Sequence, residues 1–328
     1  MSHSLPPPPA ADVELSALFP RLGDPDATVR RLALIELADL ENEDHVPWLA
    51  AALDDADAAV RAEAAGRLSY REDPVSLAAL LNALTDSDQA VRDAAAFSLG
   101  EIREPESGQW LLPALASPEP FARAAVLRAL RELRLPASFL PALKATQDTF
   151  AQVRLEAVGV LGWLKRVEAL PALIHLANSD PDPEVRRAAV GAIGLATDAS
   201  DANVLASLLQ ALQDPAWQVR EEAATTLGKL KLAGSLNALL DALEDSYWQV
   251  RQRVTRALGR LGDARAVPAI TGSALVHGSA NLRKEAAIAL GEIADPSAVP
   301  ALEQAAQDGD PEVRKAARLA LGMIGQRA

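Results

Sequence analysis

Four histidines are the side chains of this sequence best suited to metal binding or proton transfer: His3, His45, His175 and His277. A metal site needs ligands that converge, most often two His on one helical face or His beside carboxylates. No two of the four lie close together in the sequence, and His45, which follows Glu43 and Asp44 at an expected helix start, is expected at the surface. Cysteine is absent, which excludes disulfides, thiolate ligands and a Cys nucleophile. The sequence therefore predicts no metal, no cofactor and no catalytic residues.

Arginine and aspartate, in contrast, recur at a fixed spacing. An Arg, usually preceded by Val, returns every 31 to 34 residues, and an acid stands six residues before most of these Arg. The arginines are Arg30, Arg61, Arg92, Arg123, Arg154, Arg186, Arg220, Arg251, Arg283 and Arg314. The acids are Asp24, Asp55, Asp86, Asp148, Asp180, Asp214, Asp245 and Asp308; Ser117 and His277 replace the acid in repeats four and nine. This period predicts ten copies of one structural unit.

Each repeat has room for two helices, A and then B. Positions −1, +3 and +7 relative to the Arg are apolar, +4 is mostly small or aliphatic, and these positions lie on one face of a helix; Gly follows at +8 in seven repeats. An upstream apolar segment with Pro in its first turn, such as 267–270, predicts helix A. We expect the Asp to cap helix B, the Arg to bind an Asp of a neighbouring repeat, and the Gly to let adjacent B helices approach closely.

This pattern resembles the HEAT-repeat family, and specifically the short bacterial HEAT-like repeats named after phycobilisome lyases. The resemblance covers about residues 12–325. It implies an all-α fold, an α-solenoid or superhelix of ten two-helix repeats of about 31 residues, with the B helices lining the concave side. The expected organisation is a disordered Pro-rich leader at residues 1–11 and a single solenoid domain at 12–328.

Composition restricts the partners. The 328 residues are 49% hydrophobic but only 4% aromatic, and the net charge is −13, of which residues 1–100 carry −11. Acidity opposes nucleic-acid binding, and no apolar run of 18 residues predicts a membrane span. The start lacks the features of a signal peptide. We therefore expect a soluble cytoplasmic protein whose partner is a protein or peptide, with no nucleic acid and no membrane.

Exposed positions of helix B are expected at −2, +1, +5 and +9 relative to the Arg. They are mostly charged or polar in repeats seven to ten, whereas repeats two to six place large apolar residues there: Tyr70, Phe97, Phe121, Leu155, Trp163 and Leu195. Such a patch is typical of a protein-binding surface. The competing interpretation is that the assigned positions are shifted by one residue or that these side chains fill irregular packing.

Secondary contacts are predicted at Trp217, Trp248, Arg256 and Arg260. Trp217 and Trp248 share the position three residues before the Arg, and with Tyr247 they could form an aromatic row on the rim. Stacking between adjacent repeats is the equal alternative.

The predicted function is a non-catalytic scaffold that binds a protein or peptide along its concave surface. Two alternatives stay open: an enzyme or chaperone subunit resembling the bilin lyases that share these repeats, and a regulatory subunit of a larger complex.

Overall fold

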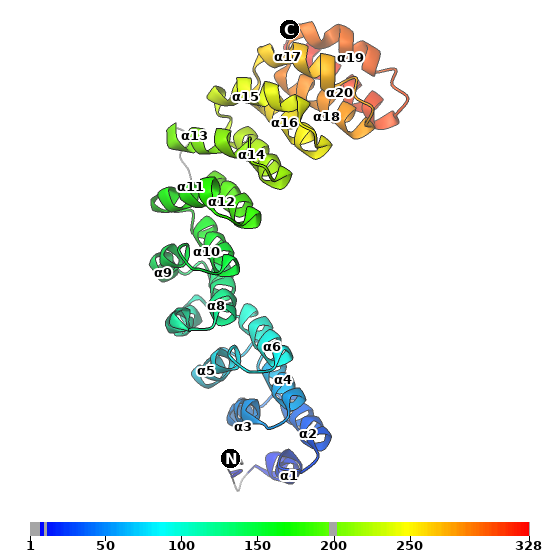
Figure 1. The fold of residues 1–328 in the computed structure, drawn as a ribbon. Helices are drawn as coiled ribbons and strands as arrows, with labels where there is room; N and C mark the ends of the chain where they lie inside the picture. The colour runs from blue at the N-terminus through cyan, green and yellow to red at the C-terminus, as the bar shows by residue number, and fades with distance from the viewer. Residues whose placement is uncertain (1–6, 10–11, 197–201, 328) are drawn as a thin grey trace. The chain divides into compact units, whose positions relative to one another are not determined.

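The computed structural model describes residues 7–9, 12–196 and 202–327, which form twenty α-helices joined by turns, short 3₁₀ segments and one π-helical turn, Ile270–Ala274 (Figure 1). Odd-numbered helices are the A helices and even-numbered ones the B helices, so the predicted all-α fold of ten two-helix repeats is confirmed. The predicted leader lies mostly outside the described residues.

The chain divides into two compact units, Met1–Leu164 and Lys165–Ala328, named here the N-terminal and C-terminal units. In the N-terminal unit the A helices are α1 (Val13–Leu22), α3 (Val46–Ala51), α5 (Pro74–Ala83), α7 (Gly108–Leu111) and α9 (Phe139–Ala145). Its B helices are α2 (Ala27–Asp39), α4 (Ala58–Arg67), α6 (Gln89–Gly100), α8 (Pro120–Leu133) and α10 (Ala151–Leu164).

The C-terminal unit repeats this order. Its A helices are α11 (Leu170–Ser179), α13 (Ala202–Ala211), α15 (Leu236–Asp241), α17 (Val267–Ala269) and α19 (Val299–Ala305). Its B helices are α12 (Pro183–Ala196), α14 (Trp217–Leu230), α16 (Trp248–Leu261), α18 (Ala280–Ile293) and α20 (Pro311–Arg327).

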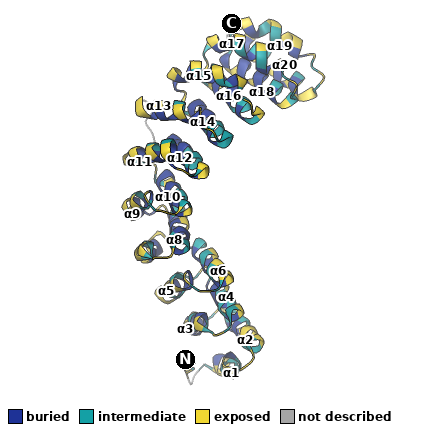
Figure 2. Cartoon of the chain, viewed as in Figure 1, coloured by how far each residue is buried: buried dark blue, intermediate teal, exposed yellow. Residues whose placement is uncertain are grey.

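Within each unit, consecutive B helices pack against one another. The residues of the predicted apolar face of helix B are buried, for example Val91, Ala95 and Leu99 of α6. Figure 2 shows buried positions along every helix pair instead of at one centre. The core is thus distributed between neighbouring helices, as expected of repeats that cannot bury their apolar faces alone.

The start of helix B differs from the prediction by two residues. The N-cap lies four residues before the Arg, as at Asp26, Asp57 and Asp88, whose carboxylates accept backbone N–H bonds of the first turn. The acid at −6 instead accepts the N–H of the N-cap residue, as in Asp57 N to Asp55 Oδ1 at 2.8 Å. The expectation that the −6 acid caps the helix was wrong, because a tight turn separates it from the first helical residue.

None of the helices in the described part of the chain is long and apolar enough to cross a membrane.

Candidate functional site

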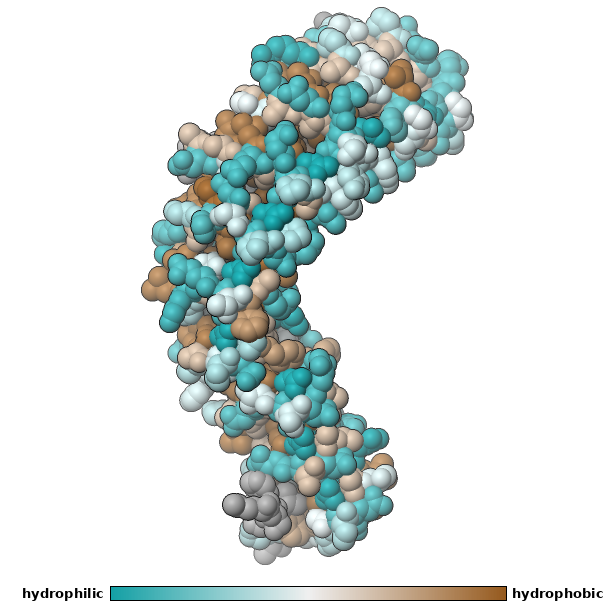
Figure 3. All heavy atoms as spheres, in the orientation of Figure 1, coloured by the Kyte–Doolittle hydropathy of each residue, from teal (hydrophilic) through white to brown (hydrophobic). Residues whose placement is uncertain are grey.

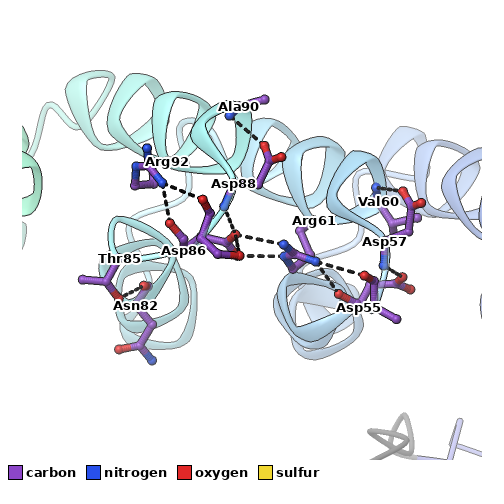
Figure 4. A network of polar contacts seen from close by, with 12 residues as sticks. Asp55, Asp57, Val60, Arg61, Asn82, Thr85, Asp86, Asp88, Ala90 and Arg92 are labelled. Carbon is purple, nitrogen blue, oxygen red and sulfur yellow. Dashed lines mark hydrogen bonds and ion pairs between the residues drawn. The ribbon is translucent and has the colours of Figure 1, made fainter.

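An Arg–Asp ladder connects neighbouring repeats within each unit, and each connection uses one guanidinium group, as Figure 4 shows for Arg61 and Asp86. Arg61 donates through Nε and Nη2 to the two carboxylate oxygens of Asp86, at 2.7 and 2.9 Å. Its Nη1 donates to the Asp55 carbonyl oxygen of its own turn at 2.8 Å. One side chain thus fixes its own turn and holds the next one, and the two parallel bonds to the carboxylate give the contact a defined geometry.

In six rungs both the Nε and the Nη2 of the Arg bind the carboxylate. They are Arg30–Asp55, Arg61–Asp86 and Arg123–Asp148 in the N-terminal unit, and Arg186–Asp214, Arg220–Asp245 and Arg283–Asp308 in the C-terminal unit. The predicted ladder is confirmed in both units.

The ladder favours the charged form of the carboxylates of Asp86 and Asp308. Hydrogen bonds from Arg283 and from the Asp310 N–H lower the pKa of Asp308 to about 2. The bond from Arg61 lowers the pKa of Asp86 in the same way, against the opposing effect of partial burial. A lowered carboxyl pKa means that the native structure stabilises the charged form.

Two rungs are altered where the sequence lacks the Asp. In repeat nine His277 stands in its place, with its Nε2 at 3.1 Å from Arg251 Nη2, and the Nε of Arg251 is buried without a hydrogen-bond partner among the described residues. In repeat four Ser117 stands there, and the Arg92 guanidinium lies 5.8 Å from the centre of the Phe121 ring.

Glycine brings the backbones of B helices close together in the C-terminal unit. A Cβ added to Gly259 would lie 2.6 Å from the Ala289 Cα, and one added to Gly228 would lie 2.7 Å from the Ala257 Cα. A Cβ on Gly100 would meet no described atom within 4 Å outside its own helix and neighbours. The packing role predicted for the Gly is confirmed at Gly228 and Gly259 and is wrong at Gly100, where the facing helix is farther away.

The apolar residues predicted in the N-terminal unit differ in exposure and in their contacts with arginine. Phe97 on α6 is 64% exposed, while Leu155 on α10 is half-buried. Trp163, near the end of α10, is 40% exposed and carries the Arg134 guanidinium 4.6 Å from its ring centre. Phe121 is half-buried beside Arg92 at the start of α8.

Tyr70 was expected on the exposed face of helix B, and that placement is wrong. Helix α4 ends at Arg67, and Tyr70 follows it in the left-handed region with a φ of 64°. Tyr70 is exposed, as expected, but it lies beyond the end of the helix and not on its face.

In the C-terminal unit, Leu195 is exposed near the end of α12. Trp217 stacks on Tyr247 of the next repeat, with ring centres 5.5 Å apart, and Trp248 is exposed. The aromatic contact is therefore stacking between repeats, as in the second of the two alternatives, and its members are Trp217 and Tyr247.

The two predicted arginines differ. Arg256 binds Glu285 through two bonds of 2.7 Å, and Glu285 is buried, so this ion pair connects α16 to α18. Hydrogen bonding to Glu285 raises the pKa of Arg256. Arg260 is exposed and lines a recess of about 70 Å³ between α14 and α16.

The sequence interpretation missed an apolar groove of about 360 Å³ between α18 and α20. Ile288, Leu319 and Met323 line it, and Leu319 is 62% exposed. They occupy the +5 and +9 positions of the last two repeats, so the rule that selected Phe97 and Trp163 would also have found them. Figure 3 shows apolar residues interspersed among hydrophilic ones on the visible face.

One histidine lies in a different environment from the one expected. His45, expected at the surface, is fully buried, and its Nε2 lies 2.7 Å from Asp12 Oδ2. That expectation was wrong because the contact joins residues 33 apart in the chain. No group of three or more His, Asp or Glu that could hold a metal ion occurs within residues 7–9, 12–196 and 202–327.

A family model for HEAT repeats matches residues 15–89, 77–146, 139–211, 205–276 and 271–328. The chain belongs to the HEAT-repeat family. A search of curated proteins finds no match.

Solved structures share the fold of this HEAT-repeat chain at low identity. An engineered protein is 21% identical with a TM-score of 0.53, over 95% of this chain and 99% of its own. YibA of E. coli is 21% identical with a TM-score of 0.56, over 82% and 98%. A chain in the structure of Kap95p with RanGDP is 16% identical with a TM-score of 0.66; the match covers 95% of the present chain but only 50% of that one.

Proposed function

We propose that this chain is a non-catalytic scaffold that binds a protein or peptide through the face formed by its B helices. The supporting observation is the exposure of large apolar side chains on B helices of the N-terminal unit: Leu32 on α2 is 47% exposed, Phe97 on α6 64% and Trp163 on α10 40%. Large apolar side chains grouped within a charged surface are typical of a protein-binding site, and Trp is enriched among the residues that contribute most to binding.

The fold supports the same proposal. Kap95p, with which the chain shares its fold, is found with RanGDP and with Nup1 in the matched structures. We place the protein in the cytoplasm, with the bacterial phycobilisome-lyase type of repeat as its nearest subtype. The charge of −13 weighs against nucleic acid as the partner.

Affinity capture from an extract of the native host, read by mass spectrometry, tests the proposal. A Phe97→Ser, Leu32→Ser double variant should capture at least about fivefold less partner, since two exposed apolar contacts typically supply about 1–3 kcal/mol together. The matched control is Trp110→Ser on α7, an A helix, where the side chain is also exposed. Equal capture by wild type and double variant, with circular dichroism showing both folded, would remove this face from the proposal.

A further inference from the structure

Arg92 has the surroundings of a ladder arginine but no carboxylate. Its Nη1 donates to the carbonyl oxygens of Asp86 and Ser87 at 2.7 and 3.0 Å, just as Arg61 donates to the turn before it. The next turn is also intact, because Arg123 Nη1 donates to the Ser117 carbonyl oxygen at 2.8 Å. Both sides of the rung are therefore in place.

Only the acidic group has been lost. In the six complete rungs the Nε and Nη2 of the Arg bind carboxylate oxygens at 2.6 to 2.9 Å. At this rung Ser117 replaces the Asp, and its Oγ accepts the Glu119 N–H at 3.2 Å. Arg92 forms no ion pair with any residue that the structure describes.

The Phe121 ring does not substitute for the missing carboxylate. Arg123 lies 5.9 Å from the Phe150 ring centre while it binds Asp148, and Arg220 lies 5.6 Å from the Tyr247 ring centre while it binds Asp245. A ring contact and a carboxylate contact thus coexist at two other rungs. Arg92 therefore has the ring contact with Phe121 but lacks the carboxylate contact.

We propose that Arg92 binds a carboxylate supplied by another molecule, the acidic side chain of a peptide, in the position that Asp occupies at the complete rungs. The guanidinium is held by two carbonyl oxygens, so little side-chain freedom is lost on binding. Phe121 offers an apolar wall to the methylene groups of the acidic residue. The other altered rung differs, because the His277 ring lies against Arg251.

This site lies at the turn before helix B and not on the exposed B-helix face, so it goes beyond the proposed function. The N-terminal unit contains 25 acidic and 14 basic residues, a net charge of −11, which repels anions in general. Binding must therefore come from the oriented guanidinium itself.

The side-chain Nε–H resonances of arginine in the 328-residue chain test the proposal, with sodium acetate as the probe and sodium chloride at equal ionic strength as the reference. Arg92→Lys identifies the resonance by its loss. A Ser117→Asp variant supplies the carboxylate within the chain. We expect acetate to move the wild-type Arg92 resonance in a saturable way toward its position in Ser117→Asp, and to leave that variant's resonance in place.

Two results would overturn the proposal: no movement beyond that produced by chloride, or the same acetate-induced movement in Ser117→Asp. If that variant does not fold, Ser117→Glu serves as the filled control. N-acetyl-aspartyl amide and N-acetylglycine then separate a side-chain carboxylate from a chain-terminal one, and tighter binding of N-acetylglycine would contradict the side-chain assignment. Because the probes are small carboxylates, failure here leaves capture by Leu32 and Phe97 unaffected.

Discussion

The two units use the same ladder but hold their B helices together differently. In the C-terminal unit, Gly228 and Gly259 leave room for the backbone of the next helix. In the N-terminal unit Gly100 makes no such contact. Their charge also differs, with a net of −11 in the N-terminal unit and −2 in the C-terminal one. A repeat motif thus fixes the connection between neighbours, while small residues and charge are free to vary from one unit to the other.

Each unit also contains an ion pair between B helices in which the glutamate is buried. Arg128 of α8 binds Glu156 of α10 at 2.9 Å, and Arg256 of α16 binds Glu285 of α18 at 2.7 Å. Both pairs join position +5 of one repeat to +2 of the next, and both glutamates are buried. Such pairs fix helix alignment, since removing one partner leaves a buried charge.

Acid should have the largest effect, because it acts on what the two units share. The folded pKa values of Asp86 and Asp308 are lowered, the latter to about 2, so their stabilisation is present above the unfolded pKa of about 4 and is lost as the pH falls toward 2. We expect the melting temperature, followed by circular dichroism, to fall steeply over this range. Asp308→Asn should flatten that fall; an unchanged pH profile would separate the ladder from acid sensitivity.

A Gly→Ala substitution should change the free energy of unfolding in opposite directions at Gly259 and Gly100. Gly259→Ala should reduce the free energy of unfolding by about 2–3 kcal/mol, because the new Cβ meets backbone that must shift. Gly100→Ala should raise it by about 0.5 kcal/mol through helix propensity. Urea unfolding of both variants measures the difference, and equal losses would show that the two units are packed alike.

Restoring the missing Asp should stabilise the C-terminal unit more than the N-terminal unit. His277→Asp gives a partner to the buried Nε of Arg251, so we expect a gain of about 2 kcal/mol. Ser117→Asp should gain about 1 kcal/mol, since water reaches the half-buried Arg92. Thermal melts at neutral pH rank the two variants, and both gains should shrink as the pH falls toward 2, because the new carboxylates then become protonated.

The smallest effect concerns helix ends in the left-handed conformation. Ala294 has a φ of 57°, and Ala294→Gly should stabilise the protein by about 1 kcal/mol. Arg134 in the N-terminal unit has a φ of 49° but lies over Trp163, so Arg134→Gly loses this contact and should gain nothing. A comparable gain at both sites in chemical denaturation would mean that the Trp163 contact adds no stability.

The repeat period made the fold predictable from the sequence, because ten copies of one pattern report the same helix boundaries independently. The ladder was predictable for the same reason. What failed depended on particular contacts: the burial of His45 follows from Asp12, and the inert position of Gly100 follows from the distance to the next helix. The offset of the N-cap arose because acids occupy both −6 and −4 in repeats such as 55–61, and composition does not rank them.

At the candidate site, position along helix B correctly selected exposed residues such as Phe97, and applied to the last repeats it would have selected Leu319. It failed at Tyr70, because α4 ends before that position. The ion pair of Arg256 could not be predicted either, because its partner Glu285 stands 29 residues later in the sequence.

Each of the six complete rungs has a direction: the guanidinium comes from the earlier repeat and the carboxylate from the later one. A repeat with both residues therefore offers an Arg to the repeat after it and an Asp to the repeat before it, so such repeats can replace one another. Excising one whole period, for example residues 62–92, would bring Arg61 before the turn that contained Ser117, whereas excising 31–61 would let Arg30 meet Asp86 in the place of Asp55. Evolution could therefore lengthen or shorten such a chain by whole repeats while the Arg–Asp pairs between neighbours are kept. The exceptions are the repeats beside Ser117 and His277, where the Asp is replaced.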